Sequence, residues 1–311
     1  MGFGLHSPLI PSCTPPLTTF RDFIMTTTNS ISSPNTTAET WLITGISSGF
    51  GRAIAEQLLA AGHRVVGTVR RIESVHDLLE RHPDLLTVRT LDVRDREAVR
   101  ALVDDTFAKH PVDVLVSNAG YGLFGAAEEL SDADVDAVLA TNLTGSIDLI
   151  RFSLPHFRKQ GFGRIVQISS YGGQVAFAGN SLYHATKWGI EGFCESVAAD
   201  MKPFGIGVTI IEPGGARTDF RYRSARVADP IPAYDGTPAH AFQAMLNPEN
   251  GLAAGDPEKM AARIIEAARR SDVPLRVVLG SQALACTIDT LEKRLADFRT
   301  QTDVARSTDF E

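Results

Sequence analysis

The chain has 311 residues, of which 43% are hydrophobic and 22% are charged, and its formal net charge is −7. A mildly acidic chain without a block of Lys and Arg is a poor partner for nucleic-acid phosphates, and no run of about 18 apolar residues is present that could cross a membrane. Cys13, Cys194 and Cys286 are too widely spaced to indicate a disulfide framework or a metal knuckle. We therefore expect a soluble, cytoplasmic enzyme with no nucleic-acid partner, no membrane span and no metal.

Residues 1–39 differ in composition from the rest of the chain. Nineteen of the first 40 residues are Ser, Thr or Pro, and only Arg21, Asp22 and Glu39 are charged. Such a segment lacks the apolar surface needed to offset the entropy lost on ordering, so it is predicted to be a disordered N-terminal extension. Residues 40–300 are predicted to form a single domain, and residues 301–311 a C-terminal tail.

From Trp41 onwards, short β-branched runs alternate with longer amphipathic stretches. Strands are predicted at Trp41–Thr44, Arg64–Val69, Leu85–Thr90, Val112–Ser117, Arg164–Ser169, Gly207–Ile211 and Leu275–Leu279. Helices are predicted at Gly51–Ala61, Glu73–Arg81, Asp95–Lys109, Ser131–Phe157, Leu182–Lys202, Pro257–Arg270 and Gln282–Phe298. Continuously apolar strands that alternate with helices predict the α/β class, as a single Rossmann-type, doubly wound parallel sheet of about seven strands with helices on both faces.

Residues 220–255 do not follow this alternation. The segment contains Pro230, Pro232, Pro238 and Pro248 and shows little periodicity. Loops of that length in a compact domain are usually functional, so this segment is predicted to be a substrate lid.

A glycine-rich turn joins the first strand to the first helix. Residues without a Cβ allow a tight turn, and they let backbone N–H groups approach a pyrophosphate at the positive end of the helix dipole. At the start of a strand–helix series this pattern favours dinucleotide binding. The candidate contacts are Thr44, Gly45, Ser47, Ser48, Gly49, Phe50 and Gly51.

Further motifs follow in a fixed order along the chain. They are Leu91-Asp92-Val93, Ser117-Asn118-Ala119-Gly120, Thr141-Asn142-Leu143-Thr144-Gly145, Ser169-Ser170, Tyr183-His184-Ala185-Thr186-Lys187, and Pro213-Gly214 with Thr218 after it. With the G-x-x-x-G-x-G spacing of the turn, they resemble the short-chain dehydrogenase/reductase family over residues 40–280. Phe50 stands where that family usually has Ile, and Ser117 where Asn is common. The resemblance implies hydride transfer between a nicotinamide cofactor and a carbonyl or secondary alcohol.

Three polar residues are candidates for the chemistry. Tyr183 and Lys187 are four residues apart on one helix face, and Ser170 ends a strand at the edge where parallel sheets bind ligands. A cation within about 4–6 Å lowers the pKa of a phenol, so Lys187 is expected to activate Tyr183 as an acid or base. Ser170 would hydrogen-bond the substrate oxygen. By resemblance, Asn142 is a fourth catalytic residue that fixes a water linking Lys187 to solvent; an ordinary helical Asn with local bonds is the alternative.

The end of the second strand indicates the cofactor. An acid there usually binds the adenine ribose of NAD, but Val69 occupies that position and Arg70 follows. A guanidinium binds a 2′-phosphate, so the sequence favours NADP; NAD is the alternative if Arg70 and Arg71 are merely solvated. The resemblance adds these cofactor contacts: Asp92, Val93, Asn118, Ala119, Gly120, Tyr183, Lys187, Pro213, Gly214 and Thr218.

The substrate pocket is expected between the segment after Ser170 and the lid. The candidate lining residues are Gln174, Val175, Phe177, Asn180, Phe220, Tyr222, Tyr234, Phe242 and Met245. These mostly apolar side chains indicate a small-molecule substrate, a lipophilic or alicyclic ketone or alcohol. The run Thr68-Val69-Arg70-Arg71 faintly resembles the hydroxysteroid and retinol dehydrogenase branch.

Three functions stay open at this point. The favoured one is an NADP(H)-dependent carbonyl reductase or alcohol dehydrogenase. The alternatives are an NAD-dependent oxidative alcohol dehydrogenase and a cofactor-binding regulator without catalysis, which would be expected to lack Tyr183 or Lys187. Apolar positions on the predicted helix Leu182–Lys202, such as Trp188, Phe193 and Val197, predict a homodimer or homotetramer, since the family pairs this helix across a two-fold axis.

Overall fold

The computed structural model describes residues 38–220, 224–244, 246, 252–270, 272 and 274–310. The predicted disordered extension, residues 1–39, lies outside the described residues except for Ala38 and Glu39.

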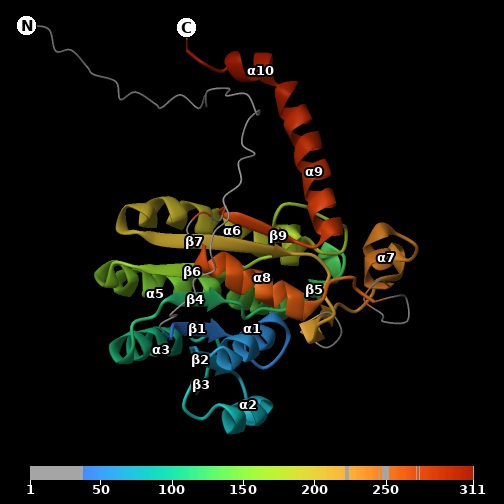
Figure 1. Cartoon of the computed structure of the whole chain (residues 1–311). Coiled ribbons are helices and arrows are strands. Elements are labelled where there is room, and N and C mark those ends of the chain that lie inside the picture. The colour runs from blue at the N-terminus through green and yellow to red at the C-terminus, as the bar shows by residue number, and fades with distance from the viewer. Residues whose placement is uncertain are drawn as a thin grey trace, which may run out of the picture. The chain divides into compact units, whose positions relative to one another are not determined.

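Seven strands form the central sheet, in the order β3-β2-β1-β4-β6-β7-β9, and every neighbouring pair is parallel (Figure 1). Their bounds are β1 Thr40–Thr44, β2 Arg64–Val69, β3 Leu86–Thr90, β4 Val114–Ser117, β6 Gly163–Ile168, β7 Ile206–Pro213 and β9 Arg276–Leu279. The strand order reverses between β1 and β4, so the sheet is doubly wound and the predicted fold class is confirmed. Parallel strands end at one edge, and the crevice at such a reversal is where these sheets bind ligands.

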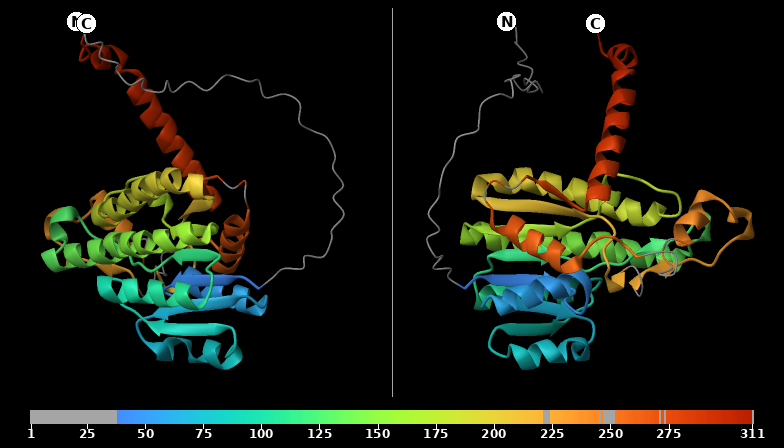
Figure 2. Two further views of the ribbon diagram at one scale, coloured as in Figure 1. Left: turned by 90° about the vertical axis from the view of Figure 1, so that its left-hand side faces the viewer. Right: turned by 45° about the vertical axis from the view of Figure 1, so that its right-hand side comes forward.

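Helices cover both faces of the sheet (Figures 1 and 2). Apolar side chains of α1, α2 and α8 pack on one face, and those of α3, α5 and α6 on the other. Because both faces are covered, a central strand such as β1 is buried along its whole length. The helix bounds are α1 Gly49–Ala60, α2 His76–Arg81, α3 Arg96–Lys109, α4 Asp132–Val138, α5 Gly145–Gln160, α6 Ser181–Met201, α7 Pro238–Ala244, α8 Pro257–Arg269, α9 Ser281–Arg299 and α10 Thr302–Arg306.

The structure departs from the predicted elements in three places. The helix predicted over Ser131–Phe157 is α4, a π-helical segment Leu139–Thr144 and α5. The predicted lid contains α7 and a short strand, β8 (Arg226–Val227), which pairs with β5 (Leu123–Phe124). The predicted C-terminal tail contains α10. Pattern alone misses the first two because a π segment keeps helical periodicity and a two-residue strand has none.

Helix α9 begins against the sheet edge and then runs away from it (Figure 2). Ala283 and Thr287 are buried near its start, whereas large apolar side chains further along are exposed. The exposed ones are Leu284, Ile288, Leu291, Leu295 and Phe298. Among the described residues, no helix combines the length and the apolar character needed to cross a membrane.

Helix α1 approaches the glycine turn so closely at Gly51 that one added methyl group should lower the stability of the fold. A Cβ on Gly51 would clash with the Gly45 carbonyl and lie 2.5 Å from Asn118 Nδ2. Overpacking of this kind costs about 1–3 kcal/mol, so Gly51→Ala should lower the free energy of unfolding by that amount in urea.

Gly192 on α6 is the matched control, because no atom lies within 4 Å of a Cβ built there. Gly192→Ala should raise the free energy of unfolding by about 0.4–1 kcal/mol, since alanine restricts the unfolded chain. Equal effects of the two substitutions would contradict the close approach at Gly51.

Candidate active site

Ser170, Tyr183 and Lys187 come together at the carboxyl edge of the sheet. Ser170 follows β6, and Tyr183 and Lys187 lie in the first two turns of α6. The side chains of Tyr183 and Ser170 are close enough for Ser170 to lower the pKa of the Tyr183 phenol. Lys187 Nζ donates a 3.0 Å hydrogen bond to the Ile168 carbonyl and lies 5.7 Å from the centre of the Tyr183 ring. All three residues are buried, with at most 9% exposed.

The pKa of Tyr183 runs opposite to the expectation from sequence. Burial raises it to about 12, and the nearby side chain of Ser170 opposes this only in part. Lys187 was expected to lower it, but the desolvation of a phenol inside the protein dominates. Burial also lowers the pKa of Lys187 to about 8, while the charge of Glu191 acts in the opposite direction. In the protein alone, Tyr183 therefore keeps its proton at neutral pH.

Asn142 connects two parts of the site through its side chain. Its Oδ1 accepts a 3.0 Å bond from the Tyr121 N–H, and its Nδ2 donates to the Tyr121 carbonyl at 2.8 Å. The same Nδ2 lies 3.5 Å from Thr186 Oγ1, which donates to the Tyr183 carbonyl. The partners are far away in sequence, so the alternative of a helical Asn with local bonds is wrong. Asn142 lies in the π segment, a helix irregularity that is frequent at functional sites.

The glycine turn is fixed by hydrogen bonds from the end of β4. Thr44 Oγ1 accepts from the N–H groups of Asn118 and Ala119 at 3.0 and 3.1 Å. Asn118 Nδ2 donates to the carbonyls of Thr44 and Gly45 at 2.8 and 3.1 Å. Gly45 adopts a φ of +76°, which favours glycine. The glycine turn and the residues Asn118–Gly120 are thus held together as one unit.

The remaining predicted cofactor residues gather around this unit. Thr218 lies beside the turn, because a Cβ on Gly49 would be 3.7 Å from Thr218 Cβ. Pro213 ends β7, and the Gly214 N–H donates to the Leu279 carbonyl at 2.8 Å. Gly120 is close to Asn142, whose Oδ1 would lie 3.1 Å from a Cβ at that position.

The charged groups beyond the turn suit an anionic ligand. Arg70 follows β2 and is exposed, and within the described part of the chain its guanidinium has no ion pair. Asp92, after β3, is paired with Arg94 at 2.6 Å, which lowers the pKa of Asp92. Val93 follows Asp92, and its carbonyl faces Gly145 at the start of α5.

The helix that follows the turn offers free N–H donors. Ser48 does not cap α1 with its side chain, and the first turn of α1 carries no acid. Ser47 is exposed, and Phe50 packs against the apolar core under the turn. A glycine turn, an uncapped helix start and an exposed guanidinium fit the diphosphate and phosphorylated ribose of a dinucleotide.

Aromatic rings pack near Tyr183. The rings of Phe124 and Phe220 lie 6.0 and 6.1 Å from that of Tyr183, centre to centre. Phe242 of α7 lies 5.4 Å from Phe124 and 6.4 Å from Phe177. The structure therefore brings Phe177, Phe220 and Phe242 together as expected, with Phe124 in addition. Phe124 was missed because a two-residue strand gives no sequence signal.

Other predicted lining residues lie elsewhere. The Gln174 amide turns to Glu191, Asn180 Nδ2 donates to the Ala178 carbonyl, and the Tyr234 hydroxyl donates to Glu128 Oε1 at 2.6 Å. Val175 is buried in the segment between Ser170 and Tyr183. Tyr222 and Met245 lie outside the described residues.

His184 is a second residue that sequence reasoning missed. Its Nε2 accepts from the Phe177 N–H at 3.0 Å, so its Nδ1 carries the proton donated to the Gly172 carbonyl at 2.7 Å. Burial lowers the pKa of His184, which is consistent with a neutral ring. His184 therefore holds the segment after Ser170 in place. The only signal was its position next to Tyr183.

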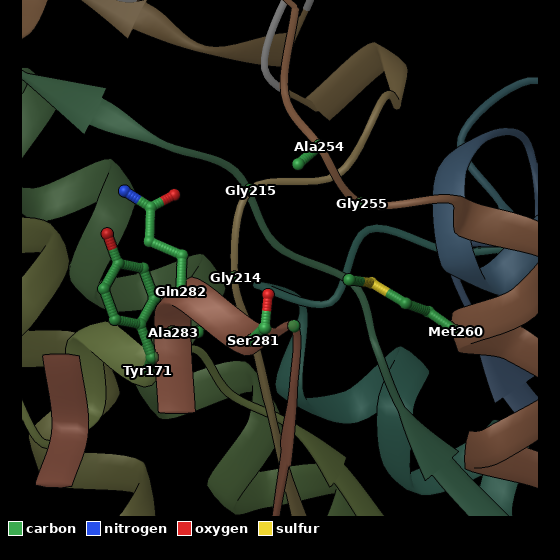
Figure 3. Close-up of a pocket in the computed structure, with 10 residues that line it drawn as sticks. Tyr171, Gly214, Gly215, Ala254, Gly255, Met260, Ser281, Gln282 and Ala283 are labelled. Atoms are coloured by element: carbon green, nitrogen blue, oxygen red, sulfur yellow. The ribbon is translucent and has the colours of Figure 1, made fainter. Parts of the chain in front are cut away.

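A cavity of about 130 Å³ lies next to this site (Figure 3). Tyr171 and Gln282 stand on one side, and Met260 reaches in from the other. Gly214 is the predicted cofactor residue that lines it. The cavity therefore adjoins the end of β7 rather than the Tyr183 ring cluster.

Comparison with known proteins agrees with this geometry. The family model for the short chain dehydrogenase matches residues 39–227. The chain is 33% identical over 250 residues to 17-beta-hydroxysteroid dehydrogenase type 1 from Homo sapiens, covering 76% of this chain and 75% of that protein. It is also 34% identical over 246 residues to oxidoreductase BOA17 from Botryotinia fuckeliana, covering 78% of this chain and 89% of that protein.

The chain is also similar to proteins whose structures have been solved. A short-chain dehydrogenase from Streptomyces avermitilis has a TM-score of 0.82 and 40% identity, covering 89% of this chain and all of that one. A metagenomic short-chain oxidoreductase in complex with NADP has a TM-score of 0.61 and 25% identity, covering 78% of this chain and 96% of that one.

Proposed function

Because the chain belongs to the short-chain dehydrogenase/reductase family, whose members act on alcohol and ketone groups, we propose that it reduces a lipophilic or alicyclic ketone with NADPH or oxidises the matching alcohol with NADP⁺. The observation that carries the proposal is that Ser170, Tyr183 and buried Lys187 come together at the carboxyl edge of the sheet, with the rings of Phe124 and Phe220 beside Tyr183. A non-catalytic regulator would not need this arrangement.

The chain's own residues would handle the proton. Bound nicotinamide would supply or accept a hydride. Ser170 and Tyr183 would both donate hydrogen bonds to the substrate oxygen, which places it for reaction. Since its pKa is raised to about 12, Tyr183 holds its proton at neutral pH and gives it up only as negative charge develops on that oxygen. Lys187, protonated below its pKa of about 8, then stabilises the phenolate that remains.

The proton-transfer role predicts the behaviour of one variant. Tyr183→Phe removes the transferable proton but keeps the ring, so turnover with a ketone and NADPH should fall by at least about a hundredfold. NADPH binding, measured by fluorescence titration, should persist. Turnover close to that of the wild type would remove Tyr183 from its role.

The preference for NADP rests on Arg70. It follows β2, is exposed, and has no acid at the preceding position, which is Val69. The NADP complex of the metagenomic oxidoreductase supports a nicotinamide cofactor of this kind in the shared fold. NAD is the alternative cofactor.

Arg70 should therefore act on one cofactor only. Its contact with a 2′-phosphate is worth about 1.5–3 kcal/mol, so Arg70→Ala should weaken NADPH binding about tenfold to a hundredfold and leave NADH nearly unchanged. Adding Val69→Asp should favour NADH further by repelling the phosphate. The ratio of kcat/KM for the two cofactors measures this. Preference of the wild type for NADH, or equal weakening of both, would refute the phosphate contact.

The ring cluster supports an apolar substrate. Phe124 and Phe220 lie beside Tyr183, and Phe242 packs against Phe124, so the surroundings of Tyr183 are apolar and suit an apolar, bulky ligand. The relative from Homo sapiens is named a hydroxysteroid dehydrogenase, which supports an alicyclic ketone as the substrate class.

Phe242→Ala tests this ring cluster. Loss of one ring contact should lower kcat/KM for an alicyclic ketone about tenfold or more, and that for a small acyclic ketone much less. Tyr234→Phe is the control, because the Tyr234 hydroxyl bonds Glu128 outside the ring cluster. Equal losses with both ketones in Phe242→Ala would argue against a bulky substrate.

Assembly as a homodimer or homotetramer belongs to the same proposal. Trp188 on α6 is 41% exposed, in the position expected for a helix pair across a two-fold axis. The apolar face of α9, from Leu284 to Phe298, is a further exposed surface. A second copy of the chain would cover such surfaces.

A cytoplasmic location is also part of the proposal. The two described cysteines, Cys194 and Cys286, are both free. Free thiols are typical of a reducing compartment.

A further inference from the structure

Two buried glutamates lie beneath the catalytic residues. Glu191 of α6 is 2% exposed and Glu212 of β7 is 1% exposed. The register of the parallel strands places Ser169, Glu212 and Arg276 on the sheet face that α6 covers, where they meet Glu191. The mechanism above does not use these groups.

Glu191 is the centre of the hydrogen bonds in this cluster. Its Oε1 accepts from Ser169 Oγ at 2.6 Å, and its Oε2 accepts from the Gln174 amide. Arg276 Nε donates to Glu191 at 3.1 Å and lies 3.3 Å from Glu212 Oε1. Glu212 lies close enough to Glu191 and Gln174 for both to affect its carboxyl, while its buried Oε1 has no hydrogen-bond partner among the described residues.

The charges in the cluster do not balance if both glutamates are ionised. One guanidinium faces two buried carboxyls, and it also pairs with Glu195, which is 59% exposed. Both buried carboxyls lie against the same Arg276 Nε and so are close to each other, and two ionised carboxylates there would repel strongly unless one of them carries a proton. Burial and the neighbouring Glu191 raise the pKa of Glu212 to about 8. The pair therefore holds one proton at neutral pH.

The cluster is tied to the catalytic residues at three points. Glu191 follows Lys187 by one helical turn, so both side chains point to the same side of α6. Ser169 immediately precedes Ser170. Gln174 follows the 3-10 turn Tyr171–Gly173, and a Cβ on Gly173 would clash with Glu191 Oε1. The carboxyl of Glu191 thus contacts the chain on both sides of Ser170.

We infer that Glu191 and Glu212 form a proton-sharing carboxyl pair that keeps one negative charge buried behind Lys187 and holds the Ser169–Gln174 segment in place. The inference rests on the function proposed above, in which Lys187 must stay protonated. Both glutamates are positioning residues, since they act through Lys187 and Ser170.

Among the charged and titratable groups near the pair, Glu191 is the one whose negative charge acts on Lys187. Cys194 lies next to it on α6, but burial raises the pKa of its thiol to about 12, so it is neutral. Arg276 is the cation of the pair, and Glu195 is in solvent. Arg294 of α9 donates to the Gln174 carbonyl at 3.1 Å. Of the carboxylates, the charge of Glu191 acts on Lys187.

The pH profile of the reductive reaction tests the inference. In Glu191→Gln the buried negative charge moves to Glu212, and the carboxylate whose charge acts on Lys187 is lost, so Lys187 should release its proton at lower pH. Glu191→Gln keeps the shape of the side chain, so the alkaline limb of kcat/KM should move to lower pH by about one unit. Glu195→Gln, which neutralises the exposed partner of Arg276, should leave the pH of the alkaline limb of kcat/KM unchanged.

A conservative variant separates charge from packing. Glu191→Asp keeps the charge but shortens the reach to Ser169, so its limb should stay near that of the wild type even if kcat falls. An unmoved limb in an active, folded Glu191→Gln enzyme would overturn the inference. A wild type that reduces no ketone would instead refute the proposed function, and binding of NADPH would show the protein to be intact.

Thermal melting tests the shared proton without turnover. Glu212 binds its proton more tightly in the folded protein than in the unfolded chain, so the wild type should lose stability as pH rises from about 5 to 8. Glu212→Gln mimics the protonated carboxyl permanently and should lose less over this range. Equal declines of the melting temperature in the two proteins would show that the pair holds no proton.

Discussion

The burial of Lys187 is the constraint on which the rest of the site depends. An ammonium group that is only 7% exposed has lost its hydration and stays charged only where neighbouring groups compensate. The Ile168 carbonyl at the end of β6 accepts its hydrogen bond at 3.0 Å, and the charge of Glu191 adds to this. The bond to Ile168 holds α6 at the end of β6, and Glu191, one turn further along α6, adds bonds to Ser169 after β6 and to Arg276 of β9. Tyr183, one turn earlier on α6, is thereby brought to Ser170.

Polar side chains between the strand ends extend this order to the cofactor floor. Asn118 holds the glycine turn, and Asn142 holds the next residues of the same loop through Tyr121. Thr186 lies next to Asn142 and donates a hydrogen bond to the backbone carbonyl of Tyr183, so it links this loop to α6. A net gain of about 0.5–1.5 kcal/mol for each bond is modest, but leaving such a buried group unpaired costs more. The turn that would bind the cofactor and the helix that carries the candidate catalytic residues therefore form one framework.

The sequence was most informative where one residue type is required by geometry or chemistry. Continuous apolar strands predicted the parallel sheet, and the glycine turn and the Tyr183–Lys187 spacing pointed to residues that the structure brings to one edge of that sheet. The partners of Asn142 and the orientation of Gln174 depend on contacts across the sheet that no local pattern encodes. The pKa of Tyr183 was misjudged because burial, which needs the three-dimensional structure, outweighs a neighbouring charge. Phe124 was missed for the same reason: only the pairing of β5 with β8 places it in the ring cluster.

The two sides of Tyr183 differ in a way that links acid strength to substrate choice. Towards the sheet lie hydrogen-bonding groups, Ser170 and the amine of Lys187; towards the lid lie the rings of Phe124 and Phe220. Burial raises the pKa of the phenol, and these rings are among the groups that pack around it. The same rings provide the surface on which an apolar ketone would rest. Under the proposed function, the burial that would suit an apolar substrate also keeps Tyr183 protonated, and so favours donation of a proton to a reduced carbonyl oxygen over its removal from an alcohol.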